Sequence, residues 1–355
     1  MPFSEYAFSD GCFPTSPLAP IQAWNCNKYE GCIPITDADG NNGWGEASLE
    51  GHTEAVEGCL DAFTARFQGI DANAIEHIWQ NGYRMGFYRG GPVLMSALAR
   101  IDIALWDLNG EEPSPVPQPC AKLRLNVHPL LARRLGLPIY ELFGGKVRDQ
   151  LRVYALIGGG RPGDVEAQAR ARITQERLKT VKSPGLDAEV DFHDRVHKAI
   201  ALQLAHKLAR SIAVLSKLVP IPIALGERLH SRWDIKPFLE SASVSILQPD
   251  ICHVGGISEL RRMATMAETY DVALAPQCPL GPIALAANLQ VDAVLANFIG
   301  TYVKNAEVWT GKGGLIRLMD GPELGIELDE MKIRAAAVDA VAWRSPSFQG
   351  LGREW

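Results

Sequence analysis

The chain contains 355 residues, enough for about two domains of ordinary size. Hydrophobic residues make up 47% and charged residues 21%, a composition typical of globular proteins and unlike that of disordered or collagen-like chains. The net charge is −6, and no long run of Lys or Arg is present, so we expect no nucleic-acid partner.

Two further features constrain location and cofactor chemistry. No apolar run reaches the ~18 residues that a membrane-spanning helix needs, and the first residues resemble no secretory signal. The seven cysteines form an odd number and show no C-x-x-C spacing, which favours reduced thiols over disulfides or a zinc site. We therefore expect a cytoplasmic protein with no membrane partner.

The first part of the sequence predicts an α+β domain. Residues that tolerate positive φ crowd the segment 37–43, which predicts a hairpin over Ile33–Glu46. Helical patterns follow at His52–Phe67 and Ala72–Tyr83. The clearest helix is Pro92–Leu108, which starts with a proline suited to a first turn and carries one apolar stripe.

From Leu151 onward, short apolar runs alternate with helical patterns, which predicts a parallel sheet covered by helices. The predicted strands are Leu151–Ile157, Leu178–Lys182, Glu189–His193, Ile221–Glu227, Val244–Asp250 and Val272–Gln277. The predicted helices are Val165–Arg177, Ala199–Leu218, Ile257–Tyr270 and Pro282–Ala296. Several strands end in a polar side chain, which is how barrel enzymes place their chemistry at one edge of a sheet.

Two carboxylates at predicted strand ends are candidate ligands for a hard cation. Asp191 and Glu227 could together hold Mg²⁺, although each could equally be a loop carboxylate or a helix cap. His193 follows Asp191 by two residues, so both side chains share one face of a strand, which favours an acid–base role over a structural one. The run His193–His197 differs from the zinc motif H-E-x-x-H in its second residue and in its position at a strand end, so we assign no zinc site there.

Several stretches carry a specific and ordered pattern of residues: GWGEASLEG (43–51), FYRGGPVLMSALARIDIALWDLNG (87–110), VDFHDRVHK (190–198) and IPIALGERLHSRWD (221–234), together with the segments 135–162, 246–287 and 321–330. They resemble the enolase superfamily, in its mandelate racemase branch. Within that branch they are most similar to the galactonate-type acid-sugar dehydratases.

The resemblance implies a modified (β/α)7β TIM barrel with an N-terminal α+β capping domain. We expect the capping domain at 1–145, the barrel at 146–311, and a segment 312–355 that returns to the capping domain. The segment 111–132 has no counterpart in the family pattern and is expected to be an insertion. The segment 183–188 is too short for a parallel crossover, so we predict a barrel truncated by one to two βα units.

The resemblance also implies a chemistry, in which Mg²⁺ and a general base remove the proton next to a substrate carboxylate. Water is then eliminated to give a 2-keto-3-deoxy acid, so the partner is a small-molecule sugar acid, and homo-oligomers are expected. Carried over by position, Asp191 and Glu227 are metal ligands, His193 is the acid, and Asp250 is the carboxylate paired with the base. We also expect His197 and Arg228 to contact the substrate.

Two departures from the family pattern put activity in question. The base position holds Gln277, whose amide takes up no proton at neutral pH. The middle carboxylate of the metal site has no counterpart, because Asp194 is the sole acidic residue between Phe192 and Gly226. The alternatives are therefore a catalytically impaired or inactive relative that assembles with an intact homologue, or another acid-sugar dehydratase or racemase.

Overall fold

The computed structural model describes residues 31–36, 42–47, 49, 52–108, 136–154, 222–303, 315–326 and 328. The helices are α1 (Thr53–Phe67), α2 (Ile75–Arg84), α3 (Pro92–Leu108), α5 (Ile139–Leu142), α9 (Arg232–Glu240), α10 (Gly256–Glu268) and α11 (Pro282–Asp292). The strands are β1 (Gly31–Thr36), β2 (Asn42–Ala47), β3 (Gln150–Tyr154), β4 (Ala224–Leu225), β5 (Ile246–Leu247), β6 (Ala273–Leu274), β7 (Gln277–Cys278), β8 (Thr301–Val303) and β9 (Leu315–Arg317). The predicted elements between 165 and 218, the insertion 111–132, and the candidate residues Asp191, His193 and His197 lie outside the described residues.

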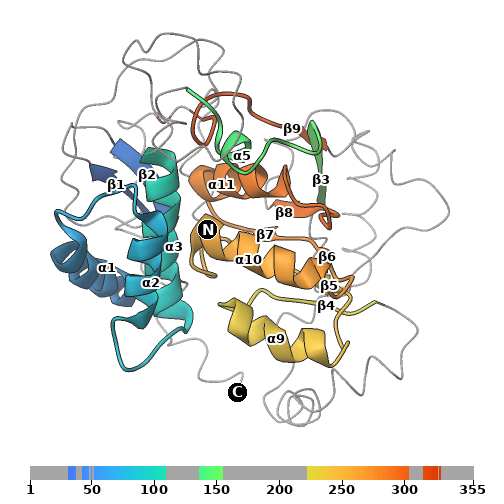
Figure 1. Cartoon of the computed structure of the whole chain (residues 1–355), viewed down its shortest axis with the longest axis horizontal. Coiled ribbons are helices and arrows are strands. Elements are labelled where there is room, and N and C mark those ends of the chain that lie inside the picture. The colour runs from blue at the N-terminus through green and yellow to red at the C-terminus, as the bar shows by residue number, and fades with distance from the viewer. Residues whose placement is uncertain are drawn as a thin grey trace, which may run out of the picture.

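The N-terminal part is an α+β unit, as predicted. β1 pairs antiparallel with β2, which confirms the hairpin predicted over Ile33–Glu46. α3 begins at Pro92 and ends at Leu108, also as predicted, and most of its side chains are buried. α1, α2 and β2 all contact α3 (Figure 1), so this helix is the centre of the capping domain.

Strand β2 packs backbone to backbone against α3. A Cβ on Gly45 would lie 1.9 Å from the carbonyl oxygen of Arg100, and a Cβ on Gly43 would lie 2.1 Å from that of Ala104. Side chains alternate along a strand, so Gly43 and Gly45 face α3 while Trp44 and Glu46 face the opposite side. The G-x-G spacing is therefore required by the close approach of the strand to the helix.

The C-terminal part consists of strand–helix units. β4, β5 and β6 form one parallel sheet, while β7, β8 and β3 form another, with β9 antiparallel at its edge. Parallel bridges between Asp250 and Gln277 and between Leu274 and Phe298 join the two sheets. Helices α10 and α11 lie between these strands and the capping domain (Figure 1).

A polar network links strands of the two sheets. The hydroxyl of Tyr154 on β3 donates to the carbonyl of Ala275 after β6 (3.0 Å) and accepts from the side-chain amide of Gln248 after β5 (3.1 Å). Since β3 and β5 are not neighbours in either sheet, these bonds hold the strands in an arc. Residues outside the described ranges decide whether the strands close into a complete or a truncated barrel. The predicted truncation of the barrel therefore stays a prediction.

Two hydrophobic cores meet at the domain boundary. One is formed by α1, α2 and α3, and the other by the strands with α9, α10 and α11. Trp44 and Ile103 come from the capping domain but belong to the second core, and Trp106 packs against both. The two domains therefore share buried apolar surface, the main source of their attraction.

A layer of arginines and aromatic rings strengthens this boundary. Arg232 and Arg262 both pair with the buried carboxylate of Glu259, at 3.1 and 3.2 Å, and both guanidinium groups lie over the ring of Trp79 on α2. Trp79 in turn donates its indole N–H to the carbonyl of Gly255 (2.8 Å). α9, α10 and α2 are thereby held together.

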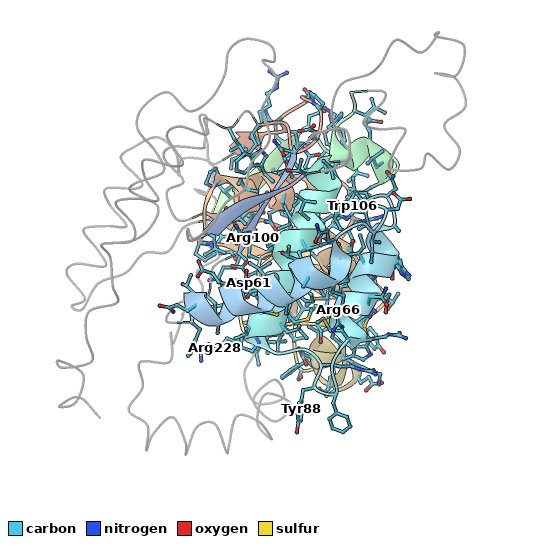
Figure 2. The ribbon with its side chains drawn as sticks, turned by 90° about the vertical axis from the view of Figure 1, so that its left-hand side faces the viewer. Asp61, Arg66, Tyr88, Arg100, Trp106 and Arg228 are labelled. Carbon is cyan, nitrogen blue, oxygen red and sulfur yellow. The ribbon has the colours of Figure 1, made fainter. Side chains whose placement is uncertain are left out.

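The loop between α2 and α3 carries exposed aromatic side chains. Phe87 is 93% exposed and Tyr88 is 87% exposed, and their rings pack edge to face. Figure 2 shows Tyr88 projecting from the end of this loop, away from the body of the protein. The two rings together form a small exposed apolar surface.

Asp102 of α3 caps helix α10. One carboxylate oxygen accepts the backbone N–H of Ser258 (2.9 Å), and the other has no hydrogen-bond partner among the described residues. Burial raises the pKa of Asp102 from 3.8 to about 7, against the hydrogen bonds from Ser258. The carboxyl group is therefore protonated in the folded protein at pH values where it is ionised in the unfolded chain.

This raised pKa predicts that stability falls as pH increases. Below pH ~4 both states are protonated; between pH ~4 and ~7 the unfolded chain releases the proton first, so folding becomes less favourable. Between pH 5 and pH 8 the wild type is expected to lose on the order of 3 kcal/mol more unfolding free energy than Asp102→Asn. Urea titrations at the two pH values measure this difference. Parallel pH dependence of the two proteins would contradict it.

Candidate active site

Glu227 and Arg228 are placed at a strand tip by a tight turn after β4. Gly226 begins this turn, and its carbonyl accepts the backbone N–H of Leu229 (2.9 Å). Gly226 has a φ of +153°, and a Cβ there would lie 2.5 Å from the backbone nitrogen of Gln248, so glycine is required at this point. Both Glu227 and Arg228 are exposed at this edge.

Asp250 lies at the tip of the neighbouring strand and is buried. One of its carboxylate oxygens accepts the backbone N–H of Cys252 (2.8 Å). Burial, followed by the charge of Glu227, raises the pKa of Asp250 from 3.8 to about 7, although the bond from Cys252 opposes this shift. Asp250 therefore exchanges a proton near neutral pH, which is what acid–base chemistry at a strand tip needs.

Gln277 is the next strand-tip residue, and it lies beside Asp250. The two residues form a parallel bridge, in which the backbone N–H of Gln277 donates to the carbonyl of Pro249 (2.9 Å). Adjacent strands therefore carry Glu227, Asp250 and Gln277 in the order that the sequence predicted. The following residue, Cys278, is no substitute base, because burial raises the pKa of its thiol well above 9.0 and keeps it protonated.

One of the two predicted cation ligands, Glu227, lies within the described residues. Glu227 is a carboxylate at the correct edge of the sheet, and its charge disfavours ionisation of Asp250, a repulsion that a bound cation would relieve. No group of three His, Cys, Asp or Glu side chains within the described ranges is arranged to hold a metal ion. The predicted second ligand, Asp191, lies outside them, as do the predicted acid His193 and the predicted substrate contact His197.

Sequence reasoning missed two histidines beside these strand tips. The ring of His253 hydrogen-bonds to the hydroxyl of Ser96 on α3 (2.9 Å), and the ring of His230 contacts the carbonyl of His253 (3.2 Å). Burial lowers the pKa of His230, so its ring is neutral at pH 7. Each histidine follows a strand-tip carboxylate, Glu227 or Asp250, by three residues, and this spacing is the signal that could have identified them.

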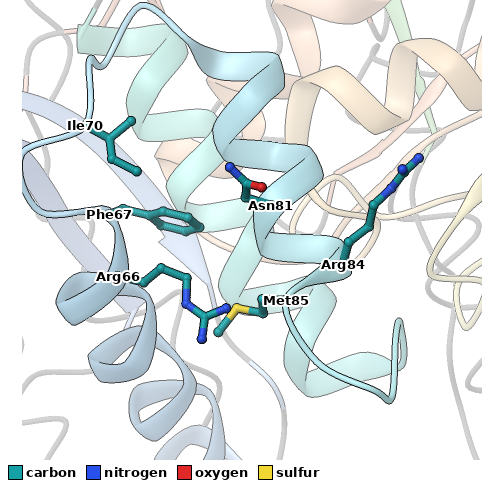
Figure 3. A pocket seen from close by; sticks show the side chains of 6 residues that line it. All are labelled: Arg66, Phe67, Ile70, Asn81, Arg84 and Met85. Carbon is teal, nitrogen blue, oxygen red and sulfur yellow. The ribbon is translucent and has the colours of Figure 1, made fainter.

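The pocket in the described part of the capping domain lies away from these strand tips. It has a volume of about 150 Å³ and lies between the end of α1 and α2, as Figure 3 shows. Its lining residues are Arg66, Phe67, Ile70, Asn81, Arg84 and Met85. None of the predicted site residues belongs to it, so it is separate from the candidate active site.

Comparisons with known proteins agree with this architecture. Residues 157–332 match the family described as enolase C-terminal domain-like. Residues 28–118 match the N-terminal domain of the mandelate racemase / muconate lactonizing enzyme family. The chain is 35% identical to D-galactonate dehydratase of Variovorax paradoxus and 37% identical to that of Ralstonia pickettii, each over 91% of this chain and 96% of the relative.

The chain belongs to the enolase superfamily, in its mandelate racemase/muconate lactonizing enzyme branch. A superfamily member from Salmonella Typhimurium matches the fold with a TM-score of 0.69 at 23% identity, over 85% of this chain and 93% of that one. An enolase from Agrobacterium radiobacter, bound to Na and L-malate, matches with a TM-score of 0.64 at 24% identity, over 89% and 95% of the two chains. These likenesses show an enolase-type α/β fold. No helix in the described ranges has the length and hydropathy of a membrane span.

Proposed function

We propose that this enolase-superfamily chain is an acid-sugar dehydratase of the D-galactonate type, which eliminates water from a sugar acid to give a 2-keto-3-deoxy acid. The observation that carries the proposal is the placement of Glu227, Asp250 and Gln277 at the tips of adjacent parallel strands. The identity of 35–37% to D-galactonate dehydratases over most of the chain supports the substrate class.

Glu227, together with Asp191, would hold Mg²⁺ in this proposal. The exposed carboxylate of Glu227 suits this role, since Mg²⁺ is commonly held by one or two carboxylates with waters and substrate oxygens. When bound, the cation would supply positive charge to stabilise the negative charge that develops on the substrate carboxylate. Two carboxylates instead of the family's three would make the binding weak.

Proton transfer requires an acid and a base from this chain. The proton next to the substrate carboxylate must be taken up, and the hydroxyl on the adjacent carbon leaves as water after receiving a proton from His193. The enol that remains becomes the keto acid. Since Gln277 takes up no proton, the acceptor is His193 or Asp250, whose pKa of about 7 matches the task.

Turnover measurements test this proposal. The purified chain, with Mg²⁺ and D-galactonate, is followed by ¹H NMR for the 2-keto-3-deoxy product, beside the Ralstonia pickettii relative as the positive control. We expect a rate about 10²–10⁴-fold below that of the relative, because Gln277 replaces the base at the family's base position. Gln277→His alone should not restore the rate, since the metal site remains incomplete. Full rescue by Gln277→His would contradict the incomplete metal site, and no product from any variant would contradict the dehydratase.

The second candidate is a non-catalytic relative that assembles with an intact homologue. The glutamine at position 277 and the missing middle carboxylate favour it, and the exposed pair Phe87 and Tyr88 offers a contact surface. In this case the chain alone should yield no product with any acid sugar, and it should co-purify with an intact homologue.

The predicted truncation of the barrel gains support from the length of the match. The alignment with the Variovorax paradoxus relative extends over 388 residues, whereas the whole chain has 355. Part of that relative therefore has no counterpart here. The short segment 183–188, where a crossover is expected, is a natural place for the missing residues.

A further inference from the structure

Glu46 extends from the capping domain to the barrel. Gly43 and Gly45 face α3, so the alternation along β2 turns Trp44 and Glu46 to the opposite side, where Trp44 enters the barrel core. Glu46 is 6% exposed, and burial raises the pKa of its carboxyl group. A buried carboxylate needs strong hydrogen bonds, and Glu46 obtains them from α11.

The carboxylate of Glu46 caps the N-terminus of α11 with both oxygens. One oxygen accepts the backbone N–H of Gly281 (2.6 Å), and the other accepts that of Ala284 (3.0 Å). A Cβ on Gly281 would lie 2.6 Å from a carboxylate oxygen of Glu46, although the φ of −85° at Gly281 suits any residue. A side chain at position 281 would therefore have to displace the carboxylate of Glu46, whereas the backbone conformation itself sets no such limit.

This contact lies within a few residues of the strand-tip glutamine. Gln277 and Cys278 form β7, which is paired with β8, and Gly281 follows just before α11. The segment 278–281 is thus held at one end by the sheet and at the other by Glu46. After burial, the charge of Asp250 is a further cause that raises the pKa of Glu46.

We propose that Glu46 is a positioning residue of the active site: its carboxylate fixes the segment 278–281 and through it the strand-tip residue Gln277. The capping domain thereby sets the geometry of the strand tips. The consequence for catalysis rests on the proposed dehydratase function, whereas the structural role does not. Glu46 itself is not assigned a contact with the substrate.

Amide hydrogen exchange of the full chain tests the structural role. Glu46→Gln keeps the size of the side chain but leaves one acceptor for two N–H groups, so exchange in peptides covering 278–285 should accelerate about tenfold. Asp102→Asn is the matched control, since it also removes a buried capping-domain carboxylate, yet one amide oxygen still accepts from Ser258. In this control, exchange over 278–285 should stay within twofold of wild type. Equal exchange in wild type and Glu46→Gln would overturn the proposal.

Gly281→Ala tests the same contact from the side of α11. It replaces Glu46→Gln in the exchange experiment if that variant does not fold. The new methyl group collides with Glu46, so Gly281→Ala should accelerate the same exchange about tenfold. Adding it to Glu46→Ala should change little, because the carboxylate that it meets is gone. Independent effects of the two substitutions would overturn the assignment.

Turnover of D-galactonate gives the catalytic readout. Gln277 takes up no proton itself, but it is bridged to Asp250, a proposed proton acceptor. Because displacement of a reacting group by about 1 Å costs up to ~100-fold in rate, Glu46→Gln should lower kcat at least tenfold with KM within twofold of wild type. Asp102→Asn should leave kcat within twofold. An unchanged kcat in Glu46→Gln would overturn the positioning role. If the wild type makes no product, the dehydratase proposal fails, while the exchange experiments still decide the role of Glu46.

Discussion

Replacing Gly45 with alanine is expected to lower the free energy of unfolding by about 3 kcal/mol or more. The added Cβ would lie 1.9 Å from the carbonyl oxygen of Arg100 and 3.1 Å from the Cβ of Ala104. The strand and the helix meet here mainly through backbone atoms, so no change of side-chain rotamer can relieve the overlap. Urea denaturation followed by tryptophan fluorescence measures the loss, since Trp44 lies next to the substituted residue.

Gly58→Ala is the matched control for this prediction. Gly58 lies inside α1 and is exposed, and a Cβ added there would have no other atom within 4 Å. The same substitution should therefore raise the free energy of unfolding by about 0.5–1 kcal/mol, because alanine is the better helix former. Equal effects at the two positions would contradict the packing of β2 on α3.

Replacing Glu227 with glutamine is expected to abolish the remaining binding of Mg²⁺. With the middle carboxylate absent, Glu227 supplies half of the negative charge that the proposed site offers to a cation. Calorimetric titration with Mg²⁺ should show weak binding to the wild type and none to Glu227→Gln. Any turnover of D-galactonate should fall at least about 100-fold, as it does when a group that stabilises transition-state charge is removed.

Glu240→Gln is the corresponding control. Glu240 ends α9, where it is exposed and pairs with Lys236 on the surface. Removing this charge should leave Mg²⁺ binding unchanged and change the free energy of unfolding by less than ~0.5 kcal/mol. Equal loss of binding in both variants would indicate a general effect of charge, and would contradict the role of Glu227 as a ligand.

The sequence predicted well those elements that are determined by residues close to one another along the chain. α3 has a proline at its start and one apolar stripe along its length, so its bounds were predicted correctly at Pro92 and Leu108. The predicted strands were longer than β4, β5 and β6, because the apolar runs continue into the irregular strand tips. α9 was not predicted, since Pro237 lies inside it and Ile235 and Leu239 are its only buried residues.

The candidate site was predicted only in part, because some of its contacts join residues that are far apart in the sequence. Polar residues after apolar runs indicated that Glu227, Asp250 and Gln277 lie at one edge of a sheet, and the structure confirms their adjacency. The role of Glu46 was not predicted, because its partner Gly281 is 235 positions away in the chain. Such a contact leaves no periodic pattern, and only the G-x-G-E spacing hints at it.

We propose that Asp191 and Glu227 bind one cation at the strand tips. A crystal structure of the chain soaked in Mn²⁺, with its anomalous signal, tests this claim most directly. We predict an anomalous peak bounded by carboxylate oxygens of Asp191 and Glu227, each about 2.0–2.2 Å from the ion. A peak elsewhere on the protein, or carboxylates of Asp191 and Glu227 that point away from each other with no ion between them, would contradict it.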